Sequence, residues 1–216
     1  MRSSPTPRLA CGILAGGRGS RYDGSPKGLL EVSEGSRILD RLLAAVRSAG
    51  FGDVVLSAND SLPYREYALK TVADRRPDRG PLAGIEALLH HLQPTYEAVL
   101  VLPCDLPGIT RHELLVLREA YLQGRGPLLV AQIGDALQPL CAIVSVGLAG
   151  AISRALDQGE DRVGRLWHKL GAVGIPFADP RPFFNINTPE DLARWRSLEA
   201  GADPKSISSG NDEDLS

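Results

Sequence analysis

Residues 9–28 read LACGILAGGRGSRYDGSPKG, and this stretch decides the fold. Its first part, Leu9–Ala15, is an apolar run that stops at Gly16-Gly17, which predicts a buried strand leading into a glycine-rich loop. The loop interleaves its glycines with three cations, Arg18, Arg21 and Lys27. Glycines let backbone N–H groups approach phosphate oxygens, and the cations can neutralise the charge of a triphosphate. The stretch therefore predicts a phosphate-binding loop after the first strand.

Two familiar phosphate-binding motifs do not fit this loop. A P-loop ends in Gly-Lys-Ser/Thr, whereas here Ser25-Pro26-Lys27-Gly28 follows Gly24. A dinucleotide-binding fingerprint needs a glycine where Tyr22 stands. The remaining alternative is a surface loop whose glycines only form turns. Cations interleaved with glycines directly after a buried strand favour phosphate binding over that alternative.

Apolar runs and helical periodicities alternate along the rest of the chain. Strands are expected at 53–58, 70–73, 98–102, 128–132, 140–144, 172–175 and 183–186. Helices are expected at 38–49, 81–92, 146–157 and 163–170, and two more begin at the caps Thr110 and Thr188. Continuously apolar strands that alternate with helices indicate a three-layer α/β/α fold around a mostly parallel sheet. Ligands of such sheets bind beyond the carboxyl ends of the strands.

Length and charge set the class of protein. The chain has 216 residues, 43% hydrophobic and 23% charged, which is typical of a globular protein. We expect one domain over residues 1–200 and a disordered polar tail over 201–216. The 24 Lys and Arg against 26 Asp and Glu give a net charge of −2, so no basic excess favours a nucleic acid. The sequence has no apolar run long enough to span a membrane and no basic amphipathic helix, so we expect no membrane partner.

The cysteines and the first residues indicate the compartment. Cys11, Cys104 and Cys141 are far apart, lie in apolar runs and form no C-x-x-C motif. This usage predicts buried, reduced thiols. Residues 1–8 are polar and contain two prolines, unlike a signal peptide. We therefore expect a cytoplasmic protein.

A single carboxylate follows the apolar run at 98–102. Asp105 stands in the segment LPCDLP, just past that predicted strand. One carboxylate suits Mg²⁺, which takes its remaining ligands from phosphates and water. The alternative is an aspartate that only forms a turn between two prolines. Because the glycine-rich loop is expected at the same edge of the sheet, the two features together predict a nucleotide–metal site.

Other polar residues are expected at the same edge. Asn59 and Asp60 end one predicted strand and Asp74 ends another, although each of them could simply form a turn or a cap. Gly80 opens the segment GPLAG, where the backbone can approach a ligand or simply turn into a helix. Asn185 and Asn187 alternate, so both amides can share one face and reach a ligand oxygen, unless they only cap the last helix.

Taken together, these motifs resemble the molybdenum cofactor guanylyltransferase family of GT-A-like nucleotidyltransferases. The resemblance rests on five segments in order: LAGGRGSRYDGSPKGLL, VADRRPDRGPLAGIEALL, LPCDLPGI, QPLCAIV and FFNINTPEDLARW. It runs from about Leu9 to Arg196. Tyr22-Asp23 departs from the Met-Gly pair that is usual in the family and could alter the loop conformation. The LAGG form is closer to the guanylyl branch than to the cytidylyl branch, where LAAG is usual.

The resemblance implies a reaction and a set of residues. The reaction is transfer of GMP from GTP to the molybdopterin cofactor with release of pyrophosphate, and it requires Mg²⁺. The implied catalytic residues are Lys27, Arg21 and Asp105, with Asp105 also holding the metal. The implied nucleotide-binding positions are Leu14, Ala15, Gly16, Gly17, Lys27, Asn59, Asp74, Gly80, Asp105, Asn185 and Asn187, and Gly24 also matches a family position. Guanine needs an acceptor for its N1–H and amino groups, for which Asp74 is the candidate.

Two alternatives to this function are retained. One is another nucleotidyltransferase of the same fold, which would use CTP or a sugar phosphate. The other is a non-catalytic nucleotide- or cofactor-binding module, against which an intact Lys27 and Asp105 argue. Expected partners are GTP and the molybdopterin cofactor, with molybdenum-insertion proteins and chaperones of molybdenum enzymes as further candidates.

Overall fold

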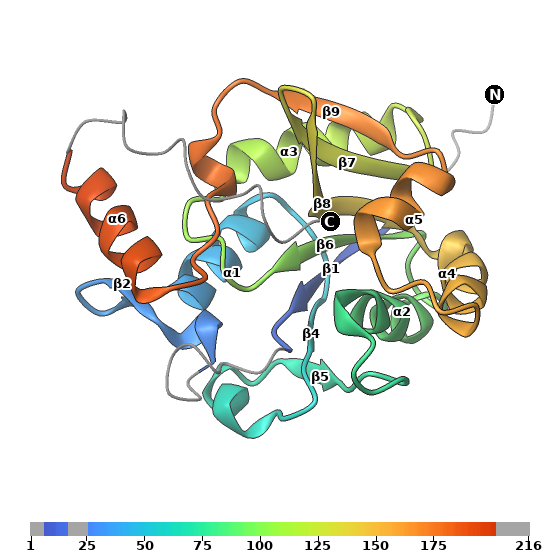
Figure 1. Ribbon diagram of the computed structural model, residues 1–216, viewed down its shortest axis with the longest axis horizontal. Helices are drawn as coiled ribbons and strands as arrows, with labels where there is room; N and C mark the ends of the chain where they lie inside the picture. The colour runs from blue at the N-terminus through green and yellow to red at the C-terminus, as the bar shows by residue number, and fades with distance from the viewer. Residues whose placement is uncertain (1–6, 17–25, 202–216) are drawn as a thin grey trace.

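The computed structural model describes residues 7–16 and 26–201 and contains a seven-stranded sheet between helical layers (Figure 1). The strand order is β5-β4-β1-β6-β8-β7-β9. The strands are β1 (Leu9–Leu14), β4 (Val54–Ser57), β5 (Lys70–Val72), β6 (Ala98–Pro103), β7 (Leu128–Ile133), β8 (Ala136–Ser145) and β9 (Val173–Phe177). A separate hairpin pairs β2 (Glu31–Ser33) with β3 (Ser36–Arg37).

The strand directions bring four strand ends to one edge. Strand β1 runs parallel to both β4 and β6, and β4 runs parallel to β5. Strand β8 is antiparallel to its neighbours β6 and β7, while β7 and β9 are parallel. The expected mostly parallel sheet is therefore confirmed. The carboxyl ends of β5, β4, β1 and β6 lie next to one another.

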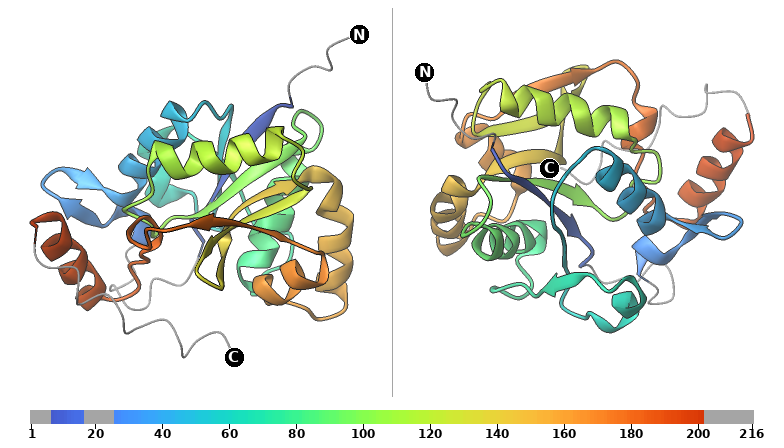
Figure 2. Two further views of the ribbon diagram at one scale, coloured as in Figure 1. Left: turned by 90° about the horizontal axis from the view of Figure 1, so that it is seen from above. Right: turned by 180° about the vertical axis from the view of Figure 1, so that it is seen from behind.

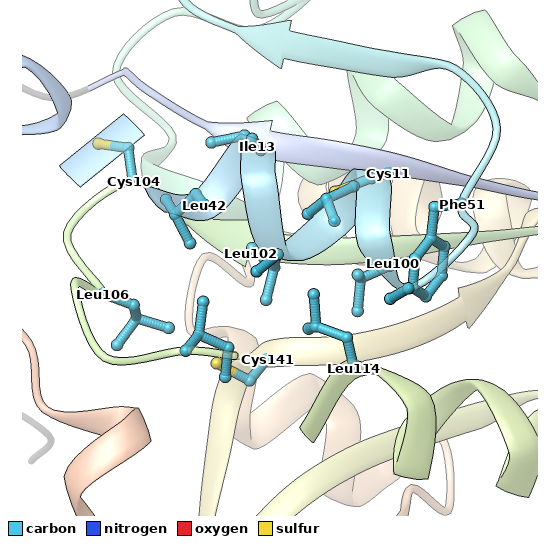
Figure 3. Close-up of a cluster of buried hydrophobic side chains, with 14 of the residues drawn as sticks. Cys11, Ile13, Leu42, Phe51, Leu100, Leu102, Cys104, Leu106, Leu114 and Cys141 are labelled. Carbon is cyan, nitrogen blue, oxygen red and sulfur yellow. The ribbon is translucent and has the colours of Figure 1, made fainter. Parts of the chain in front are cut away.

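Helices cover both faces of the sheet, as Figure 2 shows from two further directions. The helices are α1 (Ile38–Ser48), α2 (Gly80–Leu92), α3 (Arg111–Leu122), α4 (Ala149–Asp157), α5 (Val163–Lys169) and α6 (Pro189–Glu199). The core beneath α1 and α3 contains Ile13, Leu42 and Leu114 (Figure 3). The core on the other face packs residues of α2, α4 and α5, such as Leu88, Ile152 and Trp167. The three-layer α/β/α fold is confirmed.

Period-two burial explains how β1 serves both cores. Cys11 and Ile13 belong to the core beneath α1, whereas Ala10 and Leu14 belong to the core beneath α2. Between them, Gly12 lies so close to α2 that a Cβ there would stand 2.5 Å from Leu88 Cδ1. The missing side chain lets α2 pack directly on β1. This contact fixes the helix that borders the edge described above.

The predicted helix caps are confirmed. Thr110 Oγ1 accepts a hydrogen bond from the His112 amide at 3.1 Å, and the Thr110 amide donates to Glu113 Oε2 at 3.0 Å. Thr188 Oγ1 accepts from the Asp191 amide at 3.2 Å, and Asp191 Oδ2 accepts from the Asn187 amide at 2.9 Å. These bonds satisfy the free N–H groups at the starts of α3 and α6. The second cap also holds the backbone at Asn187.

The structure corrects several sequence predictions. The strand expected at 183–186 is wrong: a 3₁₀ helix, Arg181–Phe183, lies there and irregular backbone follows it. The Phe183 and Phe184 amides donate to the Pro180 and Arg181 carbonyls, at 3.0 and 3.2 Å, and the Ile186 amide donates to the Asp105 carbonyl at 3.0 Å, so these N–H groups are not available to a ladder. Residues 146–148 form a 3₁₀ turn before α4 instead of its first turn. The β2–β3 hairpin and the 3₁₀ helix Leu62–Tyr67 were not predicted.

The burial of the cysteines and the length and polarity of the helices bear on the expectations from the sequence. Cys11, Cys104 and Cys141 are buried free thiols, as expected. Burial raises the pKa of Cys104 to about 12, so this thiol stays protonated at neutral pH. Across residues 7–16 and 26–201, every helix is too short or too polar to cross a membrane.

Candidate active site

The polar residues singled out in the sequence follow adjacent strands of the sheet. Ala15 follows β1, Asn59 follows β4, Asp74 follows β5 and Asp105 follows β6. All four strands point the same way, so these residues lie along one edge. They fall into two groups on either side of the end of β1. We call Lys27, Asp105 and Asn187 the lysine cluster, and Ser57, Asn59 and Asp74 the amide cluster.

The lysine cluster joins three distant parts of the chain. Lys27 opens a 3₁₀ helix, Lys27–Leu29, and its Nζ lies 3.2 Å from Asp105 Oδ2. The same Nζ donates to Asn187 Oδ1 at 2.5 Å. The Ile186 amide bonds to the Asp105 carbonyl, which brings the segment before α6 against the end of β6. One ammonium group thus bridges a carboxylate and an amide oxygen.

The Asp105 carboxylate is mostly buried and only partly hydrogen-bonded within the described residues. Its side chain is only 15% exposed, and its Oδ1 is buried without a hydrogen-bond partner in the part of the chain that the structure describes. Burial raises the pKa of Asp105, and the charge of Lys27 opposes that rise only in part. A buried oxygen without a partner is costly, which marks a place where a ligand can bind.

The side chains of the amide cluster are hydrogen-bonded to one another. Asn59 Nδ2 donates to Asp74 Oδ2 at 3.1 Å, and the Asp74 amide donates to Asn59 Oδ1 at 2.9 Å. The Ser57 hydroxyl donates to Asp74 Oδ1 at 3.4 Å. These contacts fix the orientation of the Asp74 carboxylate at the end of β5. A carboxylate has about four lone-pair sites, so acceptor capacity remains for a ligand.

Helix α2 approaches the amide cluster through a glycine. A Cβ on Gly84 would stand 2.6 Å from Ser57 Oγ and 2.9 Å from Leu14 Cδ2. A larger side chain there would have to displace the Ser57 and Leu14 side chains at the ends of β4 and β1. The expected close approach of the GPLAG segment is therefore to the protein's own strand ends. Gly80, at the start of this segment, has φ +63°, a conformation that glycine adopts without strain.

The described start of the glycine-rich loop lies between the two clusters. The Ala15 amide donates to the Ser57 carbonyl at 2.9 Å, and the Ala15 carbonyl accepts from the Tyr64 hydroxyl at 3.1 Å. The Leu14 carbonyl accepts from the Cys104 amide at 3.1 Å. Leu14 and Ala15 are thus fixed to the ends of the neighbouring strands β6 and β4. Gly17, Arg18, Arg21 and Gly24 lie outside the described residues.

The structure places most of the predicted site residues along this edge, and it shows three polar residues whose contacts were not predicted. Asn185 stands half-buried two residues before Asn187, in backbone that is not the predicted strand. Ser57 and Tyr64 were missed because a serine at a strand end and a tyrosine in a short 3₁₀ helix carry no distinctive pattern. Glu86, a buried carboxylate on α2, was hidden in an otherwise apolar helix. Among residues 7–16 and 26–201, no three His, Cys, Asp or Glu side chains gather as a metal-binding group.

A three-layer fold with polar and charged residues beyond the carboxyl ends of its parallel strands is the architecture of an α/β nucleotidyltransferase. Comparison with known sequences agrees: residues 11–173 match the MobA-like NTP transferase domain. A molybdenum cofactor guanylyltransferase from Pseudomonas fluorescens is 37% identical over 201 residues, which cover 91% of this chain and 98% of the relative. This chain belongs to the molybdenum cofactor guanylyltransferase family.

Further relatives support the same assignment. A molybdenum cofactor guanylyltransferase from Pseudomonas aeruginosa is 38% identical over 205 residues, covering 92% of this chain and all of that protein (100%). The crystal structure of molybdopterin-guanine dinucleotide biosynthesis protein A from Archaeoglobus fulgidus superimposes with a TM-score of 0.71. It is 24% identical and covers 89% of this chain and 98% of its own, and it supports the fold alone. The family resemblance expected from the motifs is thereby confirmed.

Proposed function

We propose that this protein transfers GMP from GTP to the molybdopterin cofactor and releases pyrophosphate. Family membership supports the reaction class, and one observation of the structure supports the site. The lysine cluster and the amide cluster lie on the same edge of the sheet, with the start of the glycine-rich loop between them. One cluster offers a cation and a carboxylate for phosphates, and the other offers hydrogen-bonding groups for a base.

The spacing of the clusters suits one nucleotide. Neighbouring strands lie about 4.8 Å apart, so β5 and β6, three steps apart in the sheet, are separated by about 14 Å. A nucleotide extends over such a distance from base to phosphates. In our proposal the guanine lies over the amide cluster at β4 and β5, and the triphosphate lies over β1 and β6. We assign the binding of the phosphates to the backbone of Leu14–Gly17 and to the charge of Arg21.

Asp105 suits a magnesium ion. It presents a buried carboxylate oxygen that has no hydrogen-bond partner within the described part of the chain, beside a second oxygen held by Lys27. Mg²⁺ prefers oxygen ligands and usually takes one or two carboxylates together with phosphate and water. A single acid at the end of β6 fits that preference. When bound, the ion would neutralise charge on the phosphate oxygens.

The protein's own residues align the reacting groups. A phosphate oxygen of the acceptor attacks the α-phosphorus of GTP in line, a new P–O bond forms, and the bond to the pyrophosphate oxygen breaks. Lys27 Nζ, released from Asp105 towards the phosphates, stabilises the charge that develops on the leaving group. The attacking phosphate is already ionised near neutral pH, so no side chain has to remove a proton. Asn187 holds Lys27 from the other side of the site.

The amide cluster is our candidate for reading guanine. The Asp74 carboxylate can accept from N1–H and from the 2-amino group, which adenine and the pyrimidines do not present in this arrangement. Asn59 and Ser57 already hold that carboxylate in one orientation. Gly80 and Asn185 complete the proposed ligand-binding set. Free thiols at all three cysteines fit a reducing, cytoplasmic setting.

Incubation of the purified protein with the molybdopterin cofactor, Mg²⁺ and each nucleoside triphosphate in turn tests the proposal. We expect pyrophosphate and the guanine dinucleotide with GTP, and less than one per cent of that rate with CTP, ATP or UTP. Asp105→Ala is the negative control, and it should still fold because its side chain lies at the rim of the core. A cytidine dinucleotide from CTP would overturn the choice of base. Tight GTP binding without pyrophosphate release would indicate a non-catalytic module.

A further inference from the structure

Two arginines attach the loop that carries Asp74 to neighbouring helices. Residues 73–79 connect β5 to α2, and the loop contains Arg76 and Arg79. Arg76 Nε donates to both carboxylate oxygens of Glu86, at 3.2 and 3.1 Å. Arg79 Nη2 donates to the Leu156 carbonyl at the end of α4, at 3.0 Å. The loop is thus tied to two helices, which lie side by side in Figure 1.

Glu86 is an unusual residue for its place. It is 1% exposed and stands among the apolar residues of α2 that pack on the sheet. Besides Arg76, its Oε1 accepts a hydrogen bond from the Ser153 hydroxyl of α4 at 2.5 Å. The His90 ring nitrogen Nε2 lies 3.1 Å from the same hydroxyl. An ionised carboxylate this deep is costly unless it is fully paired, and here both oxygens are paired.

Arg76 links this buried carboxylate to the surface of α4. Its Nη1 donates to Asp157 Oδ1 at 2.5 Å, so the guanidinium spans an acid on α2 and an acid on α4. A planar, multidentate group held at both ends has one geometry, which a lysine could not reproduce. Arg76 is two residues from Asp74, and two residues of chain span at most about 7 Å. A fixed Arg76 therefore restricts where Asp74 can lie.

We propose that Glu86, acting through Arg76, is a positioning residue for the Asp74 carboxylate and thereby sets the selectivity for the base. The inference rests on the proposed function, because it assigns guanine to the amide cluster. Asn59 and Ser57 orient Asp74 from the side of β4. The Glu86–Arg76 pair holds the same loop from the side of α2. Removal of this support leaves the phosphate-binding residues in place and loosens only the base-reading group.

Inosine triphosphate is the probe that separates these effects. It has the N1–H and the carbonyl of guanine but lacks the 2-amino group, so a well-placed acceptor distinguishes GTP from it. We expect Glu86→Gln to raise the KM for GTP about tenfold and to leave kcat within twofold. The ratio of kcat/KM for GTP over that for inosine triphosphate should fall at least fivefold. Arg76→Lys, which keeps a charge on a partly exposed side chain, should lower that ratio in the same direction.

The matched control is Glu199→Gln, which breaks another arginine–glutamate pair of the molecule. Glu199 pairs with Arg41 between α6 and α1, outside both clusters. This variant should keep the wild-type ratio. A merely structural role for Glu86 would lower the melting temperature and the amount of active enzyme but would not change the ratio. Restoration of the ratio towards the wild-type value in Glu86→Asp, which keeps the charge, would support positioning.

The outcomes separate this inference from the proposed function. If the wild-type enzyme makes the guanine dinucleotide and distinguishes the two nucleotides, but Glu86→Gln and Arg76→Lys keep its ratio, the positioning role is overturned alone. It is also overturned if the variants lose kcat with KM unchanged. If the wild-type enzyme does not use GTP, the proposed function fails. Competition of the same two nucleotides for binding to wild-type and variant protein then tests the base-reading loop directly.

Discussion

The two clusters of the site differ in how fully their carboxylates are hydrogen-bonded. In the amide cluster, Asp74 is fixed by a reciprocal pair of hydrogen bonds with Asn59 and by the Ser57 hydroxyl. In the lysine cluster, one ammonium group holds Asp105, and a buried carboxylate oxygen has no partner in the described part of the chain. The amide cluster holds Asp74 in one orientation before a ligand binds. In the lysine cluster, Lys27 and Asp105 can exchange their mutual contact for contacts with a ligand. A nucleotidyltransferase needs both, because base recognition benefits from preorganisation and phosphoryl transfer changes the charge distribution.

Lysine 27 provides the largest test of this contrast. Lys27→Met should lower kcat about 100- to 1000-fold, the effect of removing one preorganised donor from a developing negative charge. Nucleotide selectivity should remain, because the amide cluster is untouched. Steady-state pyrophosphate release measures both quantities. Lys169→Met is the control: this lysine pairs with Glu160 on the surface and should not affect turnover. Retention of more than a tenth of wild-type kcat in Lys27→Met would show that the lysine cluster is not where the chemistry occurs.

Aspartate 74 tests the other cluster. Asp74→Asn places a donor opposite the N1–H of guanine, so kcat/KM for GTP should fall about 10- to 100-fold, the cost of about 1–3 kcal/mol for an unpaired polar group. The loss should appear in KM and not in kcat. Asp60→Asn is the control on the neighbouring turn, where Asp60 Oδ1 accepts from the Leu62 amide at 2.9 Å. An equal loss in both variants would mean that this region acts through loop structure alone.

Glycine 84 tests how far the amide cluster depends on the close approach of α2. Gly84→Ala puts a methyl group 2.6 Å from Ser57 Oγ, and the required shift should cost about 1–3 kcal/mol of stability. The KM for GTP should rise about tenfold. Gly150→Ala on α4 is the control, since the added carbon would lie 3.5 Å from Arg154 Nη1, an ordinary van der Waals contact. We expect Gly150→Ala to be neutral or slightly stabilising. A fully active Gly84→Ala enzyme would contradict a rigid amide cluster.

Asp105→Asn tests how much stability the buried carboxylate of Asp105 costs. Burial raises the pKa of Asp105 in the folded protein above its unfolded value of about 3.9, so ionisation destabilises the fold as the pH rises through the folded pKa. Asp105→Asn removes this penalty. We expect its melting temperature at pH 8 to exceed that of the wild type by about 2–4 °C, the equivalent of about 1 kcal/mol. The difference should disappear below the unfolded pKa, and calorimetry across pH would detect it. A lower melting temperature at pH 8 would show that the pair with Lys27 outweighs burial.

The sheet and the common edge could be predicted because they follow from local sequence. Continuous apolar runs gave β1 and β6, and the rule that ligands bind at carboxyl ends placed Lys27 and Asp105 near each other. The structure shows these two side chains in contact, although their roles in catalysis stay predictions. Thr188 was predicted as a cap from its hydroxyl and the following proline, and it is one.

Other features depend on tertiary packing and left no local signal. The segment 183–186 has the composition of a strand, but it docks on Asp105 through Ile186 and joins no ladder. Glu86 lies in an apolar helix, and its partner Arg76 precedes that helix in a loop, so neither residue suggests the other. Ser57 acquires its importance only where α2 meets β4 at Gly84. Side-chain pairings between elements are set by how the layers pack, and periodicity does not report them.

A crystal structure with GTP and Mg²⁺ tests the central claim most directly. The account predicts one nucleotide along the edge of the sheet, with guanine on the Asp74 carboxylate and the triphosphate at Lys27. It also predicts that the Lys27 ammonium has moved from Asp105 to a phosphate oxygen and that Asp105 has turned to the metal. A nucleotide bound elsewhere, or one that leaves the contact between Lys27 and Asp105 intact, would contradict it.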